Sequence, residues 1–297
     1  DRGHNISCPA RAQFMKKPAK RATFHLPHSA KSFTTKKQLG QNFLADPNVK
    51  RKIIAACDLS EDDIVLEIGP GGGALTRELA PRVKKLIAIE TDKTLAQELH
   101  TEFQGTSTEI IHADFLKYPV ESLPDHLKII GNLPYYISTP IIDKILLHPD
   151  KFSIFYLTIQ YELGRRLAAG PGTKEFGVFS CFVQYYAEPK ILFKIKNTAF
   201  RPIPKVDSCF LKLTPLKRSN KAQDEHWLFQ IIRHAFQQRR KILTNALSGL
   251  IETEKLQEML KELDLREKVR AENLKLEDFI ALANRTTSRR SSLETNA

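Results

Sequence analysis

The sequence predicts an α/β protein with a doubly wound, mainly parallel sheet, followed by a small all-helical C-terminal domain. Between residues 63 and 158, short apolar runs suited to buried strands alternate with segments of helical periodicity. A glycine cluster, Gly69 to Gly73, lies between the first of these runs and the next helix, where doubly wound folds place a ligand-binding turn. From Trp227 onward, apolar residues recur at helical spacing.

The elements of the α/β part follow in chain order. Asp46-Pro47 begins an amphipathic helix, because Pro is favoured in a first helical turn. The first four expected strands end at or just before a glycine or a polar residue and cover 63–68, 85–90, 109–113 and 128–131. Three further strands are expected at 152–158, 190–196 and 208–213. The expected helices between them cover 75–80, 94–103, 140–147 and 160–168. Ligands of such a sheet bind at the carboxyl ends of its strands.

The composition divides the chain into four expected parts. These are a basic, disordered arm (1–35), the α/β domain (36–214), a helical RNA-binding domain (215–285) and a disordered tail (286–297) rich in Ser, Thr and Arg. Residues 2–45 contain Lys and Arg but no acid and no continuous apolar segment, which argues against a secretory signal. An organellar transit peptide has a similar composition, so that alternative stays open.

Charge and cysteine usage narrow the class of protein. The chain has 46 Lys and Arg against 34 Asp and Glu, a formal charge of +12, which favours a polyanionic partner, nucleic acid before an anionic membrane. No apolar run approaches the roughly 18 residues of a membrane span. The four cysteines form no C-x-x-C pair, so they indicate neither a zinc site nor a disulfide framework. We expect a soluble, cytoplasmic monomer without a bound metal.

Three acids accompany the glycine turn. Gly69 and Gly71 allow close backbone approach of a ligand, with Glu67 just before them, Glu90 ending the second strand and Asp114 following the third. Glu90 also fits an NAD-binding fingerprint, so a dehydrogenase is an alternative. However, three carboxylates repel the phosphates of a dinucleotide and suit a cationic ligand that carries an ammonium group, such as S-adenosylmethionine.

A second site is expected at the end of the strand at 128–131. Asn132 and the carbonyl of Leu133, which precedes Pro134, can each accept a hydrogen bond from an amino group. Two acceptors on one amine favour a tetrahedral nitrogen, and Tyr135 can stack on a planar base that has left its helix. This pattern fits methylation of an exocyclic amine, although Asn-Leu-Pro-Tyr taken alone is as often an ordinary proline turn.

Most of residues 36–284 resemble the ribosomal RNA adenine dimethyltransferase family, and its small-subunit enzymes more than its macrolide-resistance branch. The resemblance rests on nine segments: KKQLGQNFL (36–44), EIGPGGGALT (67–76), AIETD (88–92), AD (113–114), GNLPYYIST (131–139), RLAAGPGTKEFG (166–177), FRPIPKVDS (200–208), FQQRRKIL (236–243) and RAENLKLEDFIALAN (270–284). It implies a Rossmann-like class I methyltransferase sheet. It also implies transfer of methyl groups from S-adenosylmethionine to N6 of two adjacent adenines in the 3′-terminal hairpin of small-subunit rRNA, within the assembling 30S-type subunit.

The resemblance also implies roles for individual residues. The cofactor would meet Asn42, Leu44, Glu67, Gly69, Gly71, Glu90 and Asp114. Asn132, with Leu133 and Pro134, would orient the target amine beside the cofactor, and Tyr135 and Phe200 would enclose the adenine ring. Arg239, Arg240 and Lys241 form a basic run that we expect on a helix in contact with RNA, the plain alternative being a solvated face.

The chain departs from the family pattern at two positions, and two alternative functions stay open. Tyr161 replaces the family's usual Lys and can cost one RNA contact, and Tyr136 stands where many members carry Asn. The nearest alternative is a large-subunit enzyme of the macrolide-resistance type, which Leu133 disfavours because that branch tends to carry Ile there. The other is an assembly checkpoint that acts chiefly by binding immature subunits.

Overall fold

The computed structural model describes residues 42–294, with side chains to residue 287. The predicted basic arm, the fourth cysteine, Cys8, and the last three residues lie outside this range. Among the described residues, no helix has the length and apolar character needed to cross a membrane. The other cysteines, Cys57, Cys181 and Cys209, are buried free thiols, as expected.

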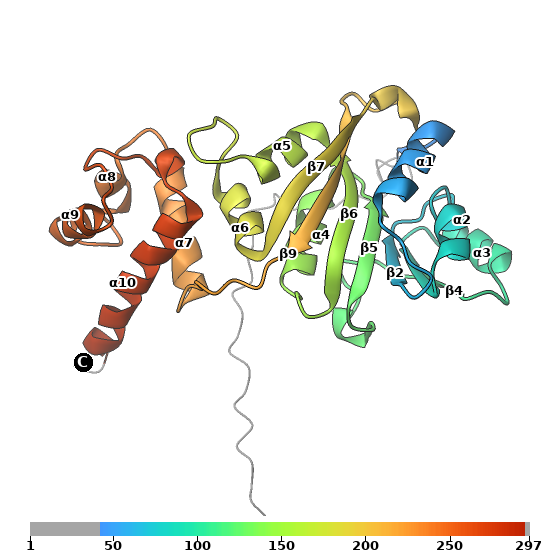
Figure 1. Cartoon of the computed structure of the whole chain (residues 1–297), viewed down its shortest axis with the longest axis horizontal. Helices are drawn as coiled ribbons and strands as arrows, with labels where there is room; N and C mark the ends of the chain where they lie inside the picture. The colour runs from blue at the N-terminus through green and yellow to red at the C-terminus, as the bar shows by residue number, and fades with distance from the viewer. Residues whose placement is uncertain (1–41, 295–297) are drawn as a thin grey trace, which may run out of the picture.

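The central layer is a seven-stranded sheet with the strand order β4-β3-β2-β5-β6-β9-β7 (Figure 1). Its strands are β2 (Ile64–Ile68), β3 (Lys85–Glu90), β4 (Thr108–His112), β5 (Leu127–Asn132), β6 (Phe152–Gln160), β7 (Ala187–Ile195) and β9 (Ser208–Pro215). The first five are parallel, and β9 runs antiparallel between β6 and β7. The predicted mainly parallel, doubly wound sheet is confirmed.

Helices cover both faces of the sheet because alternate strand residues point to opposite sides. On one face Val65 packs with the buried side chains of α1 (Pro47–Ala56) and with Leu79 of α2 (Thr76–Leu79). On the other, Leu66 belongs to the same apolar core as the buried side chains of α4 (Ser138–Leu146), α5 (Tyr161–Ala168) and α6 (Val178–Tyr186). The remaining helix of this part is α3 (Lys93–Glu102). Asp46 caps α1 and Asp92 caps α3, each accepting two backbone N–H groups.

A two-stranded sheet that the sequence did not predict lies at one edge of this layer. β1 (Phe43–Leu44) pairs antiparallel with β8 (Phe200–Arg201), Leu44 opposite Phe200. The backbone N–H groups of Ala45 and Asp46 continue the contact by donating to Ala199 O, at 2.8 and 3.1 Å. Strands of two residues have no measurable periodicity, which is why the sequence gives no signal for them. The pairing brings the start of the described chain to Phe200.

The C-terminal part consists of α7 (Glu225–Gln237), α8 (Leu243–Leu247), α9 (Thr253–Glu262) and α10 (Leu276–Glu294), at the left of Figure 1. The predicted all-helical character is confirmed. These helices are not separated from the sheet by solvent, because α6 joins them to it. Phe229 of α7 lies 5.4 Å from Phe182 and 5.5 Å from Tyr185 of α6, measured between ring centroids.

Two helical features were not predicted from the sequence. No helix was predicted between 168 and 190, because the segment that forms α6 is a short, almost wholly apolar run, which fits a buried strand as well as a buried helix. The tail predicted to be disordered from residue 286 continues α10 to Glu294. Thr286 is buried there, and its Oγ1 accepts a 2.6 Å hydrogen bond from Trp227 Nε1. Composition alone does not reveal such a tertiary contact.

Candidate active site

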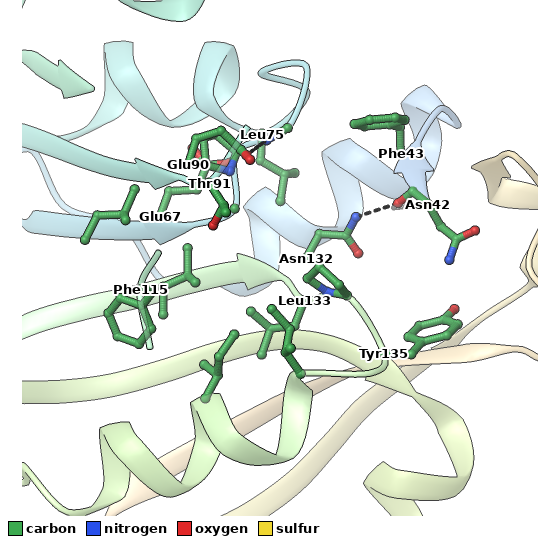
Figure 2. Close-up of a pocket in the computed structure, with 18 of the residues that line it drawn as sticks. Asn42, Phe43, Glu67, Leu75, Glu90, Thr91, Phe115, Asn132, Leu133 and Tyr135 are labelled. Carbon is green, nitrogen blue, oxygen red and sulfur yellow. Dashed lines mark hydrogen bonds between the residues drawn. The ribbon is translucent and has the colours of Figure 1, made fainter. Parts of the chain in front are cut away.

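A pocket enclosing about 970 Å³, its open mouth included, lies at the carboxyl ends of the parallel strands. Its wall contains every residue predicted for the cofactor and the target base: Asn42, Leu44, Glu67, Gly69, Gly71, Glu90, Asp114, Asn132, Leu133, Pro134, Tyr135 and Phe200. Figure 2 shows Glu67 and Glu90 on one side of it, Asn132 and Leu133 beneath, and Tyr135 on the opposite side. The structure therefore brings both predicted sites into one cavity.

The glycine turn is built to approach a ligand closely. Gly69 and Gly71 have φ angles of +69° and +57°, a region that disfavours side chains. A Cβ at Gly71 would also lie 2.9 Å from Cε1 of Phe43, which covers the turn from β1. The N–H of Gly71 donates a 2.9 Å hydrogen bond to Glu90 Oε2. The turn is thus fixed to the end of β3 and enclosed by the N-terminal segment.

The three acids differ in their surroundings. Glu67 is 2% exposed, and its Oε2 has no hydrogen-bond partner among the described residues. Burial, which disfavours the charged form, raises the pKa of Glu67 to about 8. The Glu90 carboxylate is oriented by two backbone N–H groups, those of Gly71 and Asp92. Asp114 Oδ1 accepts from the N–H of Leu116 at 3.0 Å.

An unpaired buried carboxylate oxygen costs free energy unless a ligand satisfies it. Glu67 therefore fits a ligand that brings a positive charge and N–H donors into the pocket, as the methionine part of S-adenosylmethionine does. A pyrophosphate has acceptor oxygens and no N–H group to donate to this oxygen. The site residues of this chain fit the predicted cofactor better than a dinucleotide.

Asn132 ends β5 and its carboxamide has a defined orientation. The amide Nδ2 donates a 3.0 Å hydrogen bond to the backbone carbonyl of Asn42, drawn as a dashed line in Figure 2. This bond uses the amide's donor side and leaves Oδ1 as an acceptor, as a clamp for an amine requires. The next residue is held too, since the N–H of Leu133 donates to Thr158 O of β6 at 3.1 Å. The contact from Asn42 to Asn132 spans 90 residues, and no local pattern in the sequence predicts it.

Both aromatic residues predicted to enclose the target ring line the pocket. The hydroxyl of Tyr135 lies 2.7 Å from Ser208 Oγ, which ties the half-buried ring to β9. Phe200 is 1% exposed and belongs to β8, where it pairs with Leu44. Three further aromatic residues that sequence reasoning did not assign also line the cavity: Phe43, Phe115 and Tyr136. Each lies within two residues of a predicted site residue, and that proximity was the available signal.

The predicted RNA-contacting run is outside this pocket, and the expectation that it lies on a helix was wrong. Residues 238–241 form a turn that follows α7. Arg239 donates to the carboxylate of Glu272 at 2.7 Å and to the carbonyl oxygens of Lys174 and Thr173 at 2.8 and 3.1 Å. Its guanidinium therefore joins the C-terminal helices to the loop after α5. Arg240 and Lys241 are exposed.

A doubly wound sheet with an antiparallel strand inserted beside its last member, and an acid-lined glycine turn at the carboxyl ends of its strands, define a class I methyltransferase. Among solved structures, a dimethyladenosine transferase from Plasmodium falciparum is similar over 83% of this chain and 98% of its own, with a TM-score of 0.73 and 26% identity. The 23S rRNA methyltransferase ErmE is similar over 82% of this chain and 99% of its own, with a TM-score of 0.66 and 25% identity.

Sequence comparison gives the family. The family model described as Ribosomal RNA adenine dimethylase matches residues 32–288. The Ribosomal RNA small subunit methyltransferase A of Ligilactobacillus salivarius is 41% identical over 84% of this chain and 90% of its own length. The protein of that name from Clostridium acetobutylicum is 38% identical over 85% and 94%. The chain belongs to the ribosomal RNA adenine dimethylase family and is an S-adenosylmethionine-dependent rRNA adenine N6,N6-dimethyltransferase.

Proposed function

We propose that this enzyme dimethylates N6 of two adjacent adenines in the 3′-terminal hairpin of small-subunit rRNA, within the assembling ribosomal subunit. The observation that carries the proposal is the fixed carboxamide of Asn132, whose Nδ2 is bound to Asn42 and whose Oδ1 remains an acceptor in the pocket wall. The 41% and 38% identical relatives act, by their names, on the small-subunit RNA, which supports that substrate.

The proposed cofactor contacts follow from the charges of the pocket. Glu67 receives the cofactor's ammonium group at its unpartnered oxygen, and the ligand's positive charge favours the ionised carboxylate. Glu90, already oriented by two N–H groups, accepts from the ribose hydroxyls, and Asp114 accepts from the adenine amine. Leu44 of β1 and Asn42, which precedes β1, close the pocket. When bound, S-adenosylmethionine supplies an electrophilic methyl group on a sulfonium.

The target amine needs orientation more than a strong base. The lone pair of an adenine amine is delocalised into the ring, so the nitrogen is a poor nucleophile. Asn132 Oδ1 and the carbonyl of Leu133 each accept one N–H, which favours a tetrahedral nitrogen whose lone pair is free to attack. Tyr135 and Phe200 hold the ring between them. The first transfer leaves one N–H for the second round of methylation.

RNA contact is proposed for the exposed turn after α7. Arg240 and Lys241 are exposed there and can reach phosphates, whereas Arg239 contributes chiefly by fixing the turn. The formal charge of +12 supports a polyanionic substrate such as ribosomal RNA. We propose that the enzyme works as a monomer in the cytoplasm, where subunits of the kind that its bacterial relatives modify are assembled.

The large-subunit alternative has one observation in its favour, the similarity to ErmE. That enzyme is 25% identical to this chain, whereas the small-subunit relatives are 38 to 41% identical. Both kinds of enzyme require the same amine chemistry, so the pocket does not separate them. We therefore propose the small-subunit substrate.

The test is methyl transfer from labelled cofactor to three substrates: unmethylated small subunits, large subunits and naked small-subunit RNA. Digested nucleosides are then identified by mass spectrometry. We expect N6,N6-dimethyladenosine from small subunits, at two positions per subunit. Transfer to large-subunit RNA in preference to small subunits would contradict the proposal.

A further inference from the structure

Exposed apolar side chains occur in the pocket wall and in the loop that follows the pocket residue Phe200 in the chain. The described part of the chain has five large hydrophobic residues that are strongly exposed: Phe43, Tyr136, Ile203, Val206 and Leu216. Phe43 and Tyr136 line the pocket itself. Ile203 and Val206 belong to the loop 202–207, which leaves β8 directly after the pocket residue Phe200 and its neighbour Arg201. Four of these five side chains thus belong to the pocket wall or to the loop that begins two residues after Phe200.

The loop 202–207 is held in place although its tip is exposed. Asn197 donates through Nδ2 to Pro204 O and through its backbone N–H to Asp207 Oδ1, both at 3.0 Å. Asp207 also pairs with Lys194 at 2.8 Å, and its backbone oxygen accepts from the N–H of Tyr161 at 3.0 Å. These contacts fix both sides of the loop, so Ile203 projects from a supported base.

Ile203 is the more exposed of the two loop residues, at 55% against 46% for Val206. It stands between Pro202 and Pro204, which restrict the backbone on either side of it. A β-branched side chain adds little flexibility of its own. Removing such a group from water by contact with a partner is favourable, because burial of apolar surface lowers the free energy.

The surroundings of Ile203 indicate which partner that is. Arg201 and Lys205 are exposed on either side of it, while the loop's acid, Asp207, is already paired with Lys194. Apolar tips flanked by cations suit nucleic acid, where the cations meet phosphates and the apolar group meets base faces. An adenine that enters the pocket must also leave its stack, which costs a few kcal/mol and exposes the faces of its neighbours.

We propose that Ile203 is a positioning residue that enters the RNA base stack beside the target adenine and holds the stack open while the adenine occupies the pocket. This inference rests on the proposed function, since it presupposes an RNA adenine as substrate. Proteins that kink or unstack duplexes insert Ile, Leu, Phe or Pro side chains in this way. Val206 lies in the same loop and contacts the base next to the target adenine.

The test compares Ile203→Ser with Leu216→Ser, a matched control at another strongly exposed aliphatic position. The first readout is kcat/KM for methylation of unmethylated small subunits. The second is the fluorescence of a hairpin RNA that carries 2-aminopurine at the target position, which brightens when the base leaves its stack. We expect Ile203→Ser to lower kcat/KM about tenfold and to reduce the brightening at saturating enzyme, with cofactor affinity unchanged. Ile203→Leu should restore both.

Several results would overturn the inference. These are an unchanged fluorescence rise in Ile203→Ser, an equal loss in Leu216→Ser, or a fall in rate explained entirely by weaker RNA binding. A wild-type enzyme that binds the hairpin without any rise in fluorescence would do so too. Failure of the proposed function is seen separately, as absence of methyl transfer by the wild type to small subunits.

Discussion

Replacing Glu67 with Gln should stabilise the ligand-free protein at neutral and alkaline pH. Glu67 is buried, and its pKa is raised from 4.5 to about 8. The folded state therefore retains a proton on this carboxyl that the unfolded state releases between those two values. Stability falls with rising pH across that window, by about 1.4 kcal/mol per unit, and reaches a constant value above pH 8. Gln cannot ionise, so the stability of the variant does not fall in this pH range.

The difference is measured by thermal unfolding of both proteins from pH 5.5 to 8.5. Between pH 5.5 and 7.5 the variant should gain about 3 kcal/mol relative to wild type, or on the order of 5 °C in Tm. Glu98→Gln, which removes an exposed carboxylate from α3, is the control and should show no such trend. Parallel Tm curves for wild type and Glu67→Gln would refute the reasoning, because a Glu67 that ionises normally would give them.

The same substitution, Glu67→Gln, should weaken binding of the cofactor. If Glu67 receives an ammonium group, its loss removes a charged hydrogen bond worth about 1.5 to 3 kcal/mol, roughly 10- to 150-fold in affinity. Calorimetry with S-adenosylmethionine measures this. A variant that is more stable when empty and binds less tightly is the expected combination. An unchanged affinity would remove Glu67 from the cofactor site.

Three further predictions concern other parts of the molecule. Gly71→Ala puts a Cβ 2.9 Å from Phe43 at a φ of +57°, so we expect a loss of about 1–2 kcal/mol in unfolding free energy and at least roughly tenfold weaker cofactor binding, by melting and calorimetry. Arg240→Ala should reduce the salt dependence of RNA binding by about one unit of slope while cofactor affinity stays constant, as titrations at several salt concentrations would detect. Thr286→Val leaves a buried indole N–H without its acceptor and should cost about 1–3 kcal/mol in denaturant unfolding, whereas a disordered tail would show no effect.

The sheet was predictable because its strands obey simple local rules. Each parallel strand is a short apolar run ending in a glycine or polar residue, and the helices between them have one apolar face. The rules failed where tertiary contacts decide the structure. α6 is a short, almost wholly apolar run, which fits a buried strand as well as a buried helix. Thr286 continues a helix because it meets Trp227, which lies 59 residues away in the chain.

The sequence was sufficient to predict which residues form the site, but not how their side chains are oriented. Glu67, Glu90 and Asn132 lie in the last two residues of their strands. Parallel strands bring their carboxyl ends together, so the proximity of these residues follows from the fold. The sequence does not show that Asn42 O fixes the carboxamide of Asn132, since that contact depends on the pairing of β1 with β8. The sequence also shows Arg239 in a basic run, but it does not show that the guanidinium of Arg239 donates its hydrogen bonds to other residues of the protein.

The role proposed for Asn132 is to present a hydrogen-bond acceptor to a small-subunit rRNA adenine. It is tested most directly by nucleoside mass spectrometry of small-subunit RNA from cells that lack the gene, complemented with wild type or with Asn132→Ala. We predict that wild type restores N6,N6-dimethyladenosine at two adjacent positions. The variant should bind unmethylated subunits without restoring the modification. Dimethyladenosine at wild-type levels in the uncomplemented deletion cells, or in those carrying Asn132→Ala, would contradict the account.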